Sequence, residues 1–102
     1  MTIIKKVCSM IDEELDGAEQ YIECALKHKD TNRSLADVFY TISTEEMRHV
    51  NLLHGEVVRL IEDYRRENGE PPADMMAVYE YVHGKHVDRS TGIRVMQTMY
   101  KE

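Results

Sequence analysis

Charged side chains interrupt an apolar helical pattern in residues 39–49, which read Phe39-Tyr40-Thr41-Ile42-Ser43-Thr44-Glu45-Glu46-Met47-Arg48-His49. The apolar stripe of this predicted helix passes through Leu35, Phe39, Ile42, Leu53, Leu60 and Tyr64. Glu46 lies one turn after Ile42 on that stripe, and His49 follows one turn later on the same side. Met47 and His54 fall off the stripe. The sequence therefore predicts a carboxylate and an imidazole on a buried helix face.

A first helix is predicted upstream, from about Thr2 to His28, because apolar residues recur there every three or four positions. The polar connector Asp30–Arg33 separates it from the second helix, for which Ser34 is the expected N-cap. The second helix is expected to end at Asn68-Gly69. Two long helices joined by a connector of about five residues predict an antiparallel hairpin.

The segment that follows Pro71-Pro72 has a different pattern. A short amphipathic helix is predicted from about Ala73 to His83, and Gly84 and Gly92 weaken the helical pattern beyond it, before a terminal helix. We therefore predict a single all-α domain, residues 1–102. It would consist of a long antiparallel hairpin in residues 1–69 and short C-terminal helices in residues 70–102.

Glu14 is a second carboxylate on an apolar stripe, one turn from Ile11 and one turn from Ala18. An unpaired buried carboxylate costs several kcal/mol, and a bound cation would compensate for that cost. The spacing Glu46-x-x-His49 allows both side chains to hold one ion. Glu14, Glu46 and His49 are therefore the predicted metal ligands and catalytic residues. The alternative is a polar layer in a dimer interface, where hydrogen bonds set the register.

With Tyr21 seven residues after Glu14, these motifs resemble the ferritin-like superfamily, closest to rubrerythrin-type proteins and short encapsulated ferritins. The resemblance covers roughly residues 11–64. It implies a four-helix bundle that binds two metal ions through a Glu from each of two helices and a Glu-x-x-His from each of the others. This chain carries the motif once, so the resemblance implies a bundle completed by dimerisation. Two iron ions per dimer are expected, with Mn or Zn as alternatives.

The function that the resemblance implies is oxidation of Fe(II) by dioxygen or peroxide, in iron handling or oxidative-stress defence. Such a ferroxidase or peroxide-reducing oxidoreductase would act as a homodimer or a larger even-numbered homo-oligomer. The chain has no C-x-x-C pair, so a peroxidase would need an external electron donor. The alternative function is a metal-free or structurally metallated helical module for assembly or interaction.

Composition narrows the class of protein. The net charge of −6, from 19 acidic and 13 basic residues, argues against nucleic-acid binding, which needs a concentrated basic face. No segment approaches the ~20 apolar residues of a membrane span. Cys8 and Cys24 belong to no paired motif and fit a reducing compartment. We therefore expect a cytoplasmic protein with no membrane partner.

The remaining histidines have two interpretations each. His83 and His86, three residues apart, have the spacing of a zinc-binding pair, but the neighbouring Gly84 favours a solvated helix end. His54 lies five residues after His49 and off the apolar stripe. It is interpreted as a surface histidine, with a secondary metal role as the alternative.

Overall fold

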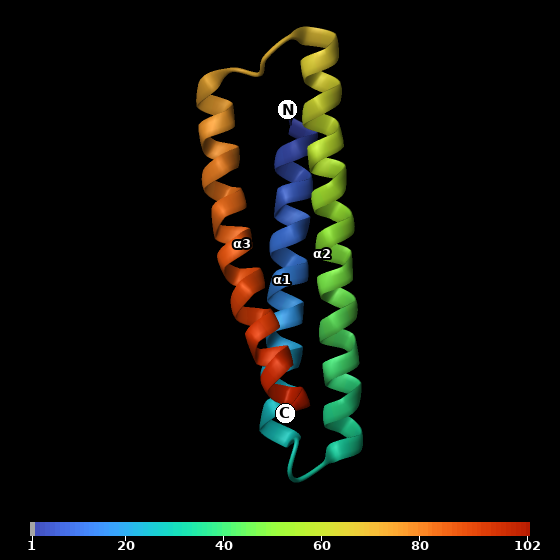
Figure 1. The fold of residues 1–102 in the computed structure, drawn as a ribbon. Coiled ribbons are helices and arrows are strands. Elements are labelled where there is room, and N and C mark those ends of the chain that lie inside the picture. The colour runs from blue at the N-terminus through green and yellow to red at the C-terminus, as the bar shows by residue number, and fades with distance from the viewer. Residues whose placement is uncertain (1) are drawn as a thin grey trace.

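The computed structural model describes residues 2–102, and within that range it contains three α-helices and no strand. The helices are α1 (Thr2–His28), α2 (Arg33–Asn68) and α3 (Ala73–Lys101). In Figure 1, α2 runs antiparallel to α1, and α3 returns in the direction of α1. The bundle is elongated and measures 55 × 19 × 17 Å. The predicted all-α class is confirmed.

The ends of α1 and α2 follow from local hydrogen bonds. Asn32 caps α2, since its side chain accepts a hydrogen bond from the Leu35 amide at 3.3 Å, so the helix begins at Arg33. The prediction that Ser34 is the cap was therefore wrong. At the other end Gly69 adopts a positive φ of 80° and donates to the Arg65 carbonyl at 3.0 Å. The predicted end of the second helix is confirmed.

The short C-terminal helices predicted for residues 70–102 are wrong, because α3 is one continuous helix of 29 residues. Gly84 and Gly92 lie inside it. A glycine in a helix interior costs only about 1 kcal/mol relative to alanine. Tertiary burial offsets this cost, since Ile93 and Tyr100 are almost completely buried against the other helices.

The core lies where α1 meets one face of α2, with α3 closing the bundle. The buried residues of α1 have the predicted helical spacing: Ile4, Val7, Ile11, Leu15, Ala18, Ile22 and Ala25. On α2 the most buried face differs from the predicted stripe. Met47, predicted to lie off the stripe, is only 3% exposed, whereas Leu35 is 39% exposed. Phe39, Ile42, Leu53 and Leu60 are half-buried.

Polar contacts fix the position of α3. His86 Nε2 lies 2.7 Å from Asp12 Oδ1, and Arg89 pairs with Asp16 at 2.8 Å. Near the end of α3, the buried Ser43 of α2 donates to the Ala18 carbonyl of α1 at 2.7 Å and accepts from Gln97 Nε2 at 2.9 Å. Ser43 therefore links all three helices.

Among the described residues, no helix combines the length and the apolar character that a membrane span requires.

Candidate metal centre

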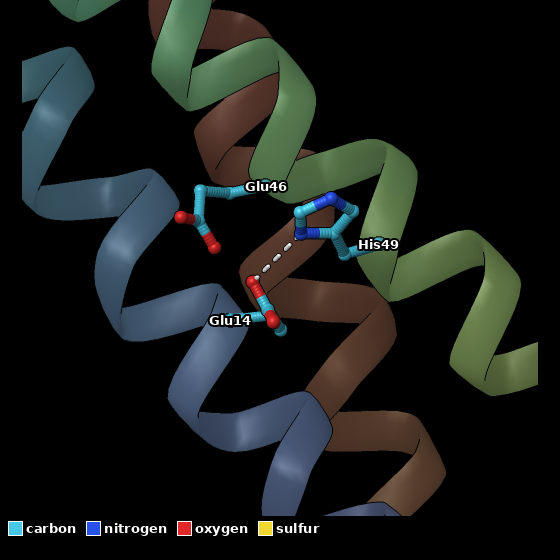
Figure 2. Close-up of side chains that lie close together, drawn as sticks. All are labelled: Glu14, Glu46 and His49. Atoms are coloured by element: carbon cyan, nitrogen blue, oxygen red, sulfur yellow. Dashed lines mark hydrogen bonds and ion pairs between the residues drawn. The ribbon is translucent and has the colours of Figure 1, made fainter.

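The structure brings Glu14, Glu46 and His49 together, as the sequence predicted. One potential ligand atom from each of the three side chains lies within 4.8 Å of the other two. Figure 2 shows Glu14 approaching from α1 and the other two side chains from α2, with His49 Nδ1 3.3 Å from Glu14 Oε2. Within residues 2–102, this is the one group of three or more His, Cys, Asp or Glu side chains that meets this spacing.

Gly17 leaves room for the Glu46 carboxyl between the helices. A Cβ atom built on Gly17 would lie 3.4 Å from Glu46 Cδ and 3.5 Å from its Oε2. An alanine would therefore be in van der Waals contact with the carboxyl, and a longer side chain would have to displace it. Because Gly17, one turn after Glu14, has no side chain, the Glu46 carboxyl of α2 can lie against α1 at this point.

The electrostatics of the cluster are those of two acids held close together. The pKa of Glu46 is raised to about 7, first by its hydrogen bond with Glu14, then by burial and by the Glu14 charge. The nearby His49 opposes this rise. Without a cation, Glu46 thus keeps its proton far above the usual pH range of a glutamic acid. A bound cation would remove the reason for that protonation.

The cluster is more open than the sequence predicted. In this chain the Glu14 side chain is 28% exposed and the His49 side chain 44% exposed. The prediction of a buried helix face is therefore only partly correct. α3 lies behind the cluster in Figure 2 and leaves its other side uncovered.

Apolar side chains surround the cluster on this uncovered side. On α1, Ile3, Met10 and Tyr21 lie 11, 4 and 7 residues from Glu14, spacings that return to the same side of a helix. On α2 the apolar residues of the predicted stripe likewise lie at spacings from Glu46 that return to the same side of the helix. We call this set the site face; it consists of Ile3, Met10, Tyr21, Leu35, Phe39, Ile42, Leu53 and Leu60. Its residues are exposed or half-buried in the single chain.

The donor set fits a divalent transition metal. Two carboxylates and one imidazole suit iron or manganese, and they also occur in zinc sites. Tyr21, which sequence spacing related to Glu14, packs against Phe39 with ring centroids 5.9 Å apart. Three side chains would leave further coordination positions of an ion open.

The structure also places His54 beside the pair His83 and His86, to which the sequence did not relate it. His86, predicted at a solvated helix end, is only 7% exposed, because α3 is continuous and packs this residue against Asp12. His54 is half-buried and stacks on His83, with ring centroids 4.7 Å apart. The signal in the sequence was the spacing of His83 and His86, but it could not show that His54 lies opposite.

Comparisons with protein-family models, curated proteins and solved structures gave no match for this chain.

Proposed function

We propose that this chain is a ferritin-like metal-binding protein that oxidises Fe(II) with dioxygen or peroxide at a dimer-bridging di-iron site. The observation that carries the proposal is the convergence of Glu14, Glu46 and His49 from two helices to within 4.8 Å. The raised pKa of Glu46 supports it, since two carboxyls held this close favour a cation between them. The physiological role would be iron handling or defence against peroxide.

Dimerisation would complete the site. The residues of the site face lie at helical spacings from Glu14 or Glu46, and each is exposed or only half-buried in the single chain. A second copy packed on this face by a two-fold axis would bury those residues and bring a second ligand set to the first. The ligands of two ions would then be four glutamates and two histidines, the composition of di-iron carboxylate proteins.

Each side chain has a distinct part in this proposal. Glu46 releases its proton as a cation binds, and its carboxylate, with that of Glu14, neutralises the charge of the ion. His49 would contribute an imidazole nitrogen as a ligand and so help to fix the coordination geometry. Two bound Fe(II) ions supply two electrons, enough to reduce dioxygen to hydrogen peroxide or hydrogen peroxide to water. An external electron donor would be needed for repeated peroxide reduction.

The alternative function is a helical assembly module without catalysis. It is favoured by the 3.3 Å contact between His49 and Glu14, which lets the two side chains satisfy each other without a metal. In that case the site face would serve association alone. The two functions differ in what removal of Glu46 does to bound iron and to oxygen consumption.

The decisive experiment is anaerobic loading with Fe(II), followed by metal analysis, native mass measurement and oxygen consumption on the same sample. The wild-type chain should bind iron in a ratio of about one per chain in an even-numbered oligomer and consume oxygen. Glu46→Ala should lose both properties. The matched control is Glu45→Ala, the exposed neighbour on α2, which should keep both. A wild-type protein that takes up no iron under these conditions would contradict the proposal and favour the assembly module.

A further inference from the structure

A second group of histidines lies in a groove between α2 and α3, away from the carboxylate cluster. His54 of α2 and His83 of α3 stack with ring centroids 4.7 Å apart and planes inclined by 8°. Tyr79 also stacks on His83, with ring centroids 5.8 Å apart. The groove has a volume of about 300 Å³, and its lining includes His54, His83 and His86. We call it the histidine groove.

His86 is held in place by a carboxylate. Its Nε2 lies 2.7 Å from Asp12 Oδ1 of α1, and the residue is almost fully buried. In the neutral tautomer that donates Nε2–H to Asp12, Nδ1 carries the lone pair that would bind a metal ion. Carboxylates that orient histidines in this way recur behind the ligands of metal sites.

The surroundings of His54 favour its neutral ring. Burial lowers the pKa of His54, and the neighbouring His83 and His86 lower it further. A histidine with a lowered pKa is neutral at physiological pH, and the neutral ring is the form that binds metal ions.

We propose that His54, His83 and His86 form a second metal site, which takes a divalent ion of the Zn²⁺ class and fastens α3 to the hairpin. Imidazole nitrogen is a preferred ligand of Zn²⁺ and of neighbouring transition-metal ions. Three histidines, with water in the fourth position, are one of the ligand sets of catalytic zinc sites. Asp12 is the positioning residue behind His86.

The groove leaves room for the rearrangement that binding requires. The nitrogens of the three histidines do not all lie within 4.8 Å of one another in this arrangement, since the His54 and His83 rings stack face to face. Rotation about their side-chain bonds would turn a nitrogen of each toward a common ion. Asn51 and Arg94 line another part of the groove, where Arg94 Nη2 lies 3.4 Å from Asn51 Oδ1. Apart from the histidines, Arg94 is the one formally charged side chain of the lining, and Asp12 behind His86 carries the opposite charge.

The test is a Zn²⁺ titration by calorimetry in a Glu46→Ala/His49→Ala background, which removes two of the three ligands of the carboxylate cluster. We expect one Zn²⁺ per chain and a rise in melting temperature on binding. His83→Gln and His54→Gln should each weaken Zn²⁺ binding by about tenfold or more. Asp12→Asn should weaken it by about 10- to 100-fold. Both glutamine variants change half-buried residues, and circular dichroism checks that each remains helical.

The matched control is His28→Gln at the end of α1, a half-buried histidine outside the groove, which should leave Zn²⁺ affinity unchanged. Equal affinity in His83→Gln and His28→Gln would overturn the proposal, as would absence of a calorimetric signal. The result is separable from the proposed function. His83→Gln in the otherwise unchanged chain should still load and oxidise Fe(II), and a failure of iron loading would leave the Zn²⁺ result intact.

Discussion

At the scale of single residues, Glu46 shows how the fold changes the chemistry of a side chain. Its pKa is raised from 4.5 to about 7 because Glu14 shares a hydrogen bond with it and burial disfavours its charge. A raised folded pKa means that the folded chain binds the proton more tightly than the unfolded chain. The resulting stabilisation is fully present below the unfolded pKa and is lost as pH rises through the folded pKa.

This linkage predicts the behaviour of Glu46→Gln in metal-free protein. The amide retains a donor to Glu14 and cannot ionise, so the variant mimics the protonated carboxyl at every pH. Glu46→Gln should be more stable than wild type at about pH 8.5, and the difference should shrink toward zero at about pH 4.5. Urea unfolding of the two proteins in the presence of a chelator measures the difference in stability at each pH. Glu13→Gln, an exposed acid on α1, should show no such trend, and a pH-independent difference for Glu46→Gln would contradict the prediction.

At the scale of elements, α3 depends on tertiary contacts more than on its own sequence. Gly84 and Gly92 lie in its interior, and a Cβ atom on either would meet no other atom within 4 Å. Gly84→Ala and Gly92→Ala should each stabilise the protein by about 0.5–1 kcal/mol, because alanine loses less backbone entropy in a helix. Thermal unfolding measures the gain. Gly69→Ala is the contrasting variant, since its positive φ of 80° should make the same change cost about 1–2 kcal/mol.

Ser43 tests how the three helices are joined. Ser43→Ala removes a buried hydroxyl that donates to the Ala18 carbonyl and accepts from Gln97. The free energy of unfolding should fall by about 1–2 kcal/mol, because the Ala18 carbonyl on α1 and the Gln97 amide on α3 each lose a hydrogen bond. Denaturant unfolding is the measurement. Ser34→Ala should change stability by less than about 0.5 kcal/mol, and a larger loss there would mean that Ser34 contributes to the cap of α2.

At the scale of the whole molecule, the site face predicts association. Met10 is 43% exposed and lies one turn before Glu14, so a partner on this face would bury it. Met10→Glu should weaken dimerisation by more than about tenfold, since a carboxylate would have to enter an apolar interface. It should also lower the iron bound per chain, because each copy supplies half of the ligands.

Light scattering over a concentration series measures the dimerisation of Met10→Glu and of wild type. Leu52→Glu is the matched control, because Leu52 is also exposed but lies on a different side of α2 from Glu46. It should leave the dimer intact. Equal dissociation of the two variants, or a wild-type protein that remains monomeric, would contradict a dimer through the site face.

Much of this arrangement was predictable from local patterns. The bounds of α1, the end of α2 and the gathering of Glu14, Glu46 and His49 all follow from helical spacing, a short connector and a glycine. The continuity of α3 was not predictable, because its glycines argue against a helix that packing then stabilises. The most buried face of α2 was also misplaced, since apolar residues cover more of this helix than one partner can bury.

The sequence by itself determined which residues are helical and which polar side chains share a helix side with apolar ones, because spacing along a helix is a local property. Only the tertiary structure decided which of those sides is covered. The docking of α3 buries His86 against Asp12, brings His83 onto His54, and leaves Glu14 and His49 partly exposed. The physical reason is that burial depends on which helix packs against which, and no spacing within a single helix contains that information.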